Sequence, residues 1–129
     1  MPSRTLGLIK PDSFERRLVG DIISAIEFRG QLRLAACKTE YMTQDRAKEF
    51  YAEHKDRSNF EKMTQFMASG PVLAMRLESD KDNAWELWRK MLRDLRSKYR
   101  SGAGDKNSAH GSDSAEAAER ELAFFGLAD

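Results

Sequence analysis

The two histidines are the side chains best suited to nucleophilic chemistry near neutral pH, and their surroundings differ. A neutral imidazole offers a lone pair at pH 7 and can act as a nucleophile or carry a proton. His54 lies in a charged run, residues 53–57, which favours a solvated position on a helix. His110 lies in the stretch NSAHGSDS at residues 107–114, directly before a segment with a helical pattern. His110 is therefore the candidate nucleophile.

The residues that follow His110 favour a phosphate ligand. Gly111 lets the backbone approach a ligand closely, and Ser112 can donate a hydrogen bond. The next helix would present unpaired N–H groups and the positive end of its dipole, which attract anions. Metal binding is the weaker alternative, because the paired His or Cys spacing of a metal site is missing. The glycine-rich sequence of a P-loop is missing as well.

Five cations are candidates for contact with such a ligand: Lys10, Arg57, Arg89, Arg96 and Arg100. Lys10 precedes Pro11, which disfavours a helix at the residue before it and predicts that Lys10 ends a strand. The basic segment 89–100 has two further interpretations. It is either the solvated face of a helix or, as an alternative, a surface for nucleic acid whose binding would fall steeply with salt.

Length and composition limit the classes of protein that fit. The 129 residues, 40% of them hydrophobic, fit one domain over residues 1–129. Basic and acidic residues nearly cancel, 22 against 21, which argues against nucleic acid or an acidic membrane as a partner. The sequence shows no signal-peptide pattern and no run of ~20 apolar residues, so we expect a cytoplasmic protein without a membrane partner. The one cysteine, Cys37, follows the apolar run 32–36, and we expect it to be buried.

The spacing of apolar residues predicts strands alternating with helices as far as residue 77. Strands are expected at 5–9, 32–41 and 72–77, and an amphipathic helix runs from Leu18 to the neighbourhood of Gly30. Thr43 is the expected N-cap of a helix that extends to Tyr51, and a second short helix covers 60–67. This alternation favours an α/β sandwich in which helices cover a sheet, although periodicity alone does not set the strand order.

The C-terminal part is predicted to hold two more helices. Asp82 or Asn83 opens the first, whose expected buried face carries Trp85, Trp88 and Leu92. Residues 93–109 have a less regular pattern. Asp113 and Glu116 have the spacing of a capping box, and the helix that they open is expected to bury Ala115, Ala118, Leu122 and Phe125.

Three blocks of sequence together resemble the nucleoside diphosphate kinase family. They are TLGLIKPD at residues 5–12, FMASGPV at residues 66–72 and NSAHGSDS at residues 107–114. The third block is highly specific and contains the family's phosphorylated histidine, here His110. The resemblance extends over essentially the whole chain. It implies a ferredoxin-like fold with a four-stranded antiparallel sheet covered by helices.

The resemblance also implies a reaction and a role for each site residue. A nucleoside triphosphate would phosphorylate His110, and a nucleoside diphosphate would then take the phosphoryl group in a ping-pong cycle. Glu121 would hold the other imidazole nitrogen, Ser112 would support that contact, and Tyr51 would lie beside the ring. The nucleotide would be bound by Lys10, Arg57, Arg89, Arg96 and Asn107, with Arg100 as the alternative to Arg96. Mg²⁺ would arrive with the nucleotide, and Asp113 would approach it through water.

Two departures from the family pattern alter these expectations. Asn59 stands where the family has a phenylalanine that stacks on the base. Between Arg89 and Arg96 the family has a longer loop, which carries a phosphate-binding threonine and helps to build hexamers, whereas this chain has six residues. The sequence therefore predicts an active kinase that forms a homo-oligomer, a dimer in preference to a hexamer. The alternative is a non-catalytic nucleotide- or protein-binding module that retains the fold.

Overall fold

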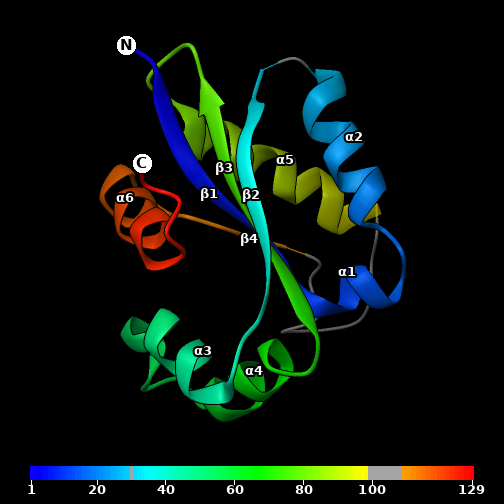
Figure 1. The fold of residues 1–129 in the computed structure, drawn as a ribbon, viewed down its shortest axis with the longest axis vertical. Helices are drawn as coiled ribbons and strands as arrows, with labels where there is room; N and C mark the ends of the chain where they lie inside the picture. Colours follow the sequence, from blue (N-terminus) through cyan, green and yellow to red (C-terminus); the bar gives the residue numbers. More distant parts are fainter. Residues whose placement is uncertain (30, 99–108) are drawn as a thin grey trace.

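Strands and helices alternate along the chain, as the apolar pattern predicts (Figure 1). The computed structural model describes residues 1–29, 31–98 and 109–129. Its elements are β1 (Ser3–Ile9), α1 (Pro11–Glu15), α2 (Val19–Arg29), β2 (Arg33–Tyr41), α3 (Gln44–Phe50), the 3₁₀ helix η1 (Ala52–His54), α4 (Phe60–Met67), β3 (Pro71–Ser79), α5 (Ala84–Lys98), β4 (Ala109–Gly111) and α6 (Ala115–Phe124). None of the described helices is long and apolar enough to cross a membrane.

The four strands form one antiparallel sheet in the order β2-β3-β1-β4. Helices α2 and α5 pack on one face, and α3, α4 and α6 pack on the other (Figure 1). The central strands β1 and β3 are therefore covered on both faces, which matches their nearly continuous burial. The predicted sheet, four-stranded and antiparallel, is confirmed.

The side chains of β1 alternate between the two faces of the sheet, and pairing with β1 fixes the face on which each side chain of β4 lies. Leu6 and Leu8 belong to the core under α3 and α6, whereas Ile9 belongs to the core under α5. Leu8 lies opposite His110, so the His110 side chain shares the face of α3 and α6. Its neighbours on β4 lie on the other face, toward α5.

Helix α5 is longer than the sequence pattern indicates. The segment 93–98, predicted to be irregular, continues the helix to Lys98, and 99–108 lie outside the described residues. The buried stripe consists of Ala84, Trp88, Met91, Leu92 and Leu95. Trp85, predicted to share this stripe, lies at its edge and is only half-buried. The helical spacing of the apolar residues continues through Leu95, and this explains why the helix does not end earlier.

The start of α6 also differs from its prediction. Ser114, not Asp113, is the N-cap, and its side chain accepts a hydrogen bond from Ala117 N at 3.0 Å. The helix therefore begins one position later than the predicted capping box implies, and its first residue, Ala115, is exposed whereas Ala117 is buried. The predicted burial of Ala118, Leu122 and Phe125 is confirmed.

Two further differences from the predictions concern the end of β1 and the edge strand β2. Pro11 stops β1 and opens α1, a short helix that the sequence pattern did not indicate, because proline suits the first turn. Cys37, expected to be buried, is exposed. It lies on β2, which is an edge strand, and an apolar run on an edge strand can face solvent on one side.

Candidate active site

His110 is the central residue of β4, and the sheet places its ring among aromatic side chains. Pairing with Leu8 directs the ring toward α3, where Phe50 and Tyr51 lie. The His110 ring centroid is 5.3 Å from that of Phe50 and 5.6 Å from that of Tyr51, and both pairs are edge-to-face. The His110 side chain retains 20% exposure. The ring is therefore shielded on its sides but remains accessible.

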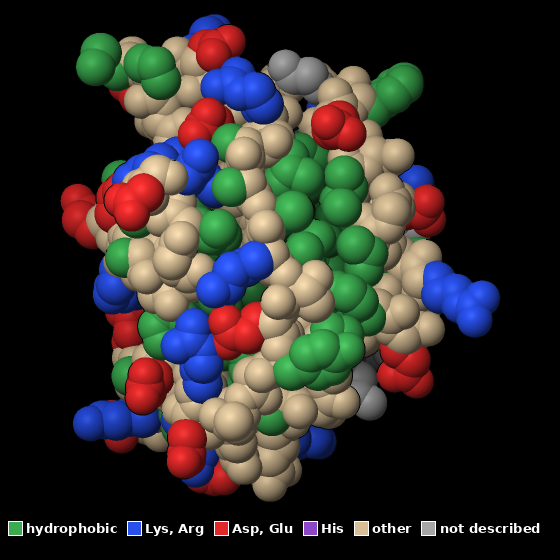
Figure 2. Space-filling model, in the orientation of Figure 1, with side chains coloured by type: hydrophobic (Ala, Val, Ile, Leu, Met, Phe, Trp, Pro, Cys, Tyr) green, Lys and Arg blue, Asp and Glu red, His purple; other side chains and the backbone are tan. Residues whose placement is uncertain are grey.

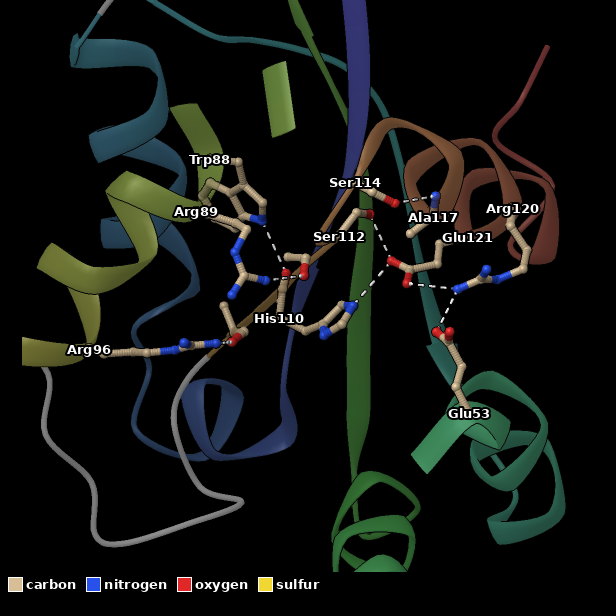
Figure 3. A network of polar contacts seen from close by, with 12 residues as sticks. Glu53, Trp88, Arg89, Arg96, His110, Ser112, Ser114, Ala117, Arg120 and Glu121 are labelled. Carbon is tan, nitrogen blue, oxygen red and sulfur yellow. Dashed lines mark hydrogen bonds and ion pairs between the residues drawn. The ribbon is translucent and has the colours of Figure 1, made fainter. Parts of the chain in front are cut away.

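One carboxylate oxygen holds both His110 and Ser112 (Figure 3). Glu121 Oε1 lies 3.1 Å from His110 Nε2 and accepts a hydrogen bond from Ser112 Oγ at 2.7 Å. The three side chains come from β4, from the residue after it and from α6. Nδ1 of His110 makes no hydrogen bond to any side chain in the described ranges. Of the two ring nitrogens, Nδ1 is thus the one available to a ligand.

Burial and neighbouring charges set the protonation states of this pair. Burial lowers the pKa of His110, nearby Lys10 and Arg96 lower it further, and Glu121 opposes the change. Burial alone would raise the pKa of Glu121, but hydrogen bonds from His110 and Ser112 and the charge of Arg120 bring that pKa below its ordinary value. The imidazole is therefore neutral near pH 7, and the carboxylate is ionised and accepts a hydrogen bond from Nε2–H.

Helix α5 directs two of the predicted cations at the strand that carries His110. Arg89 and Arg96 are seven residues apart, two helical turns, and so lie on one face of the helix. Arg89 donates to Gly111 O at 3.3 Å, and Arg96 donates to Ala109 O at 2.8 Å (Figure 3). Nε of Arg96 is buried without a hydrogen-bond partner among the described residues. Burial and the charge of Arg89 lower the pKa of Arg96.

The other predicted site residues differ in how deeply they are buried. Lys10 is buried at the end of β1, and its charge acts on His110. Arg57 and Asn59 are exposed in the turn between η1 and α4. Asp113 is exposed before α6. Asn107 and Arg100 lie outside the described residues.

Three residues near His110 were not identified from the sequence. Phe50 packs against the imidazole, and Trp88 Nε1 donates to the backbone oxygen of His110 at 3.0 Å. Arg120 pairs with Glu53 at 2.7 Å and lies 3.9 Å from Glu121 Oε2. Phe50 and Trp88 have the spacing of ordinary core residues, and Arg120 that of a solvated helix position. No local signal therefore distinguishes them.

Among the described residues, no group of three or more His, Cys, Asp or Glu side chains could hold a metal ion.

Known proteins resemble this chain over nearly its full length. A family model described as nucleoside diphosphate kinase matches residues 3–127. A protein of Oleidesulfovibrio alaskensis named nucleoside diphosphate kinase is 40% identical over 135 residues, covering 97% of this chain and 94% of its own. A protein of the same name from Pasteurella multocida is 40% identical over 131 residues, covering 95% and 92%.

Solved structures share the fold. A nucleoside diphosphate kinase of Aquifex aeolicus superposes with a TM-score of 0.80 at 33% identity, covering 98% of both chains. One of Encephalitozoon cuniculi superposes with a TM-score of 0.87 at 31% identity, covering 98% of this chain and 90% of its own. The ferredoxin-like fold expected from the sequence is confirmed.

Proposed function

The chain belongs to the nucleoside diphosphate kinase family and is a phosphotransferase that moves the terminal phosphate of a nucleoside triphosphate to a nucleoside diphosphate, and we propose that His110 carries the phosphoryl group between the two. The observation that supports this assignment is the contact between His110 Nε2 and Glu121 Oε1. It holds the ring by one nitrogen and leaves the other for substrate. We further propose that the chain acts as a single domain over residues 1–129.

The first half-reaction uses the lone pair of Nδ1. Glu121, ionised and supported by Ser112, accepts a hydrogen bond from Nε2–H, so the neutral ring carries its lone pair on Nδ1. Nδ1 attacks the terminal phosphorus, the bond from that phosphorus to the bridging oxygen breaks, and the nucleoside diphosphate leaves with the electron pair. The ring gains positive charge during the attack, and the carboxylate stabilises it. A second nucleoside diphosphate reverses the step.

Cations around His110 stabilise the charge spread over the phosphoryl oxygens. We assign this role to Lys10, Arg89 and Arg96, with Arg57 contacting phosphates from the edge of the site. We prefer Arg96 to Arg100 because Arg96 projects from α5 toward β4 and donates to Ala109 O beside His110. Asn107 binds the ribose, and Tyr51 borders the ring. When bound with the nucleotide, Mg²⁺ would supply positive charge at the phosphates, and Asp113 would approach it through water.

We propose a homodimer formed through β2. This edge strand has exposed or half-buried side chains throughout, and Tyr41 at its end is 76% exposed. Figure 2 shows apolar side chains gathered over β2 and the adjoining side of α2. An unpaired strand beside an apolar surface suits pairing with a second copy. The cytoplasm remains the proposed compartment.

Steady-state kinetics test the proposed reaction. Initial rates with varied ATP, at several fixed concentrations of a second nucleoside diphosphate, give parallel double-reciprocal lines if the phosphoryl group waits on the enzyme. Intersecting lines would mean direct transfer between two bound nucleotides and would overturn the role of His110. Absence of transfer by the folded protein would instead favour the non-catalytic alternative.

A further inference from the structure

Trp88 connects helix α5 to the backbone of His110. The indole is fully buried, and its Nε1 donates to the His110 carbonyl oxygen at 3.0 Å (Figure 3). The bond reaches the main chain of the nucleophile, on the sheet face opposite its imidazole. It therefore restrains a different part of His110 from Glu121, which holds the ring.

Two glycines allow the indole to approach this closely. Gly7 and Gly111 lie directly opposite each other on β1 and β4. A Cβ atom on Gly111 would lie 2.7 Å from Trp88 Cδ1, and one on Gly7 would lie 3.1 Å from Trp88 Cε2. The ring thus rests on two strands at a point where no side chain separates it from the backbone. Such packing leaves the indole little freedom to move.

Two arginines of α5 also donate hydrogen bonds to β4, and both have a second proposed role as phosphate ligands. Arg89 and Arg96 donate to the carbonyl oxygens of Gly111 and Ala109, the residues on either side of His110. Both are also the proposed phosphate ligands, so a bound nucleotide competes with β4 for the same guanidinium groups. Trp88 carries no charge and is fully buried, so a phosphate does not compete for its N–H group.

We propose that Trp88 is a positioning residue that keeps His110 in place while Arg89 and Arg96 contact the phosphates. This inference rests on the proposed function, because the competition exists only if the arginines bind nucleotide. The bond from Trp88 fixes the carbonyl of His110, pairing with β1 fixes the strand, and Glu121 fixes the ring. Loss of the indole N–H would leave a buried carbonyl without this donor and let Nδ1 shift relative to the phosphorus.

The test compares Trp88→Phe with Trp85→Phe, the substitution of the chain's other tryptophan, which is half-buried on the same helix. We expect Trp88→Phe to lower kcat for nucleotide exchange at least about tenfold while KM for ATP changes less than about twofold. Trp85→Phe leaves both constants within about twofold. A folded Trp88→Phe protein with the kcat of the wild type would overturn the inference.

A second variant separates the N–H group from the volume of the ring. In the Trp85→Phe background, the one remaining tryptophan is replaced biosynthetically by benzothienylalanine, which has sulfur in place of the indole nitrogen. This variant keeps the packing on Gly7 and Gly111, so it is measured even if Trp88→Phe does not fold. An unchanged kcat in this protein would show that the hydrogen bond positions nothing.

Nitrogen NMR gives a readout that does not need activity. His54→Gln leaves His110 as the one histidine, and its ¹⁵N shifts report whether the proton resides on Nε2. We expect one dominant Nε2–H tautomer with Trp88 present. In the benzothienylalanine variant the main chain of His110 shifts, the contact from Nε2 to Glu121 weakens, and we expect a mixture of tautomers. If the wild type forms no phosphoenzyme, the proposed function fails, and an unchanged tautomer in the variant would separately overturn the role of Trp88.

Discussion

At the scale of single residues, two side chains act on different atoms of His110. Glu121 Oε1 engages Nε2, and Trp88 engages the main-chain oxygen. The carboxylate defines which nitrogen attacks, because a ring that donates from Nε2 keeps its lone pair on Nδ1. The position of that nitrogen then depends on the strand that carries it.

The protonation of His110 gives the first prediction. Burial lowers its pKa below the ordinary value of 6.5, with contributions from Lys10 and Arg96 and opposition from Glu121. The rate of phosphoenzyme formation therefore stays level as the pH falls from about 8 to about 6.5 and declines only below that. NMR titration of His110 in the His54→Gln protein measures the midpoint directly. A midpoint at or above 6.5 would contradict the effect of burial.

The same shift affects stability, with a defined sign. Between the lowered folded pKa and 6.5, the unfolded chain binds a proton at residue 110 that the folded protein does not. Stability is therefore lost as the pH falls through this range, and His110→Gln removes that part of the loss. Urea unfolding at several pH values, with the wild type and the variant in parallel, measures the difference.

The second prediction concerns Asn59, which is exposed beside α4 in the position aligned with a base-stacking phenylalanine. An aromatic ring under a base contributes about 1–3 kcal/mol in comparable stacking sites. Asn59→Phe is therefore expected to bind ADP about 5- to 150-fold more tightly, as measured by titration calorimetry. Asn59→Leu is the control for added apolar area, and an affinity unchanged or weaker in Asn59→Phe would mean that residue 59 does not contact the base.

At the scale of elements, α5 combines parts that the sequence alone suggested were separate. The six residues between Arg89 and Arg96 form helix, so both arginines and Trp88 project from one rigid element toward β4. Helix α6 supplies Glu121 in the same way from the other face of the sheet. The site is therefore held between two helices across a short edge strand.

The third prediction compares Arg96 with Arg93, two arginines of α5 whose side chains point in different directions. Arg96 faces β4, whereas Arg93 is exposed on the same helix. Arg96→Ala is expected to raise KM for ATP and to lower kcat/KM on the order of 10²-fold, the loss of one charged contact to the phosphates. Arg93→Ala, the matched control, changes kcat/KM less than about threefold. Equal effects of the two substitutions would show that the charge acts only at long range.

Much of this architecture could be predicted from local sequence, and the exceptions have physical reasons. Short apolar runs predicted β1 and β3, loose alternation predicted the edge strand β2, and helical spacing predicted α2 and α4. It did not predict β4, whose three residues are too few for a pattern and depend on pairing with β1. Cys37 was wrongly expected to be buried, because a single sequence does not reveal which strand lies at the edge.

The candidate site also contains some residues that could be predicted from the sequence and others that could not. His110, Glu121 and Ser112 could be named because a specific motif and a family resemblance contain them, and the structure brings them together. Trp88, Phe50 and Arg120 reach the site through tertiary packing alone. Their residue types and spacing match ordinary core and surface positions, so only the structure places them beside the nucleophile.

At the scale of the whole molecule, the fourth prediction is a dimer in place of a hexamer. The segment between Arg89 and Arg96 is helical and its polar residues are exposed, with Asp94 paired to Arg29 at 3.0 Å. It offers no loop for a threefold contact. The edge strand β2 remains, so sedimentation velocity at several protein concentrations is expected to show a dimer.

A substitution at the centre of β2 tests which surface forms that dimer. Cys37→Lys places a charge on the exposed edge strand and is expected to favour monomers, whereas Cys37→Ser, the control, stays dimeric. A stable hexamer of the wild type at micromolar protein would contradict the predicted assembly. A dimer that persists in Cys37→Lys would show that the dimer contact does not involve β2.

The phosphoenzyme itself tests the central assignment, the phosphorylation of His110, most directly. The wild type and His110→Gln are each incubated with ATP labelled in its terminal phosphate, and the protein is separated from nucleotide. We predict that the wild type holds label that is lost in acid, survives base and passes to added nucleoside diphosphate, and that folded His110→Gln holds none. Equal labelling of the two proteins, or label that survives acid, would contradict the account.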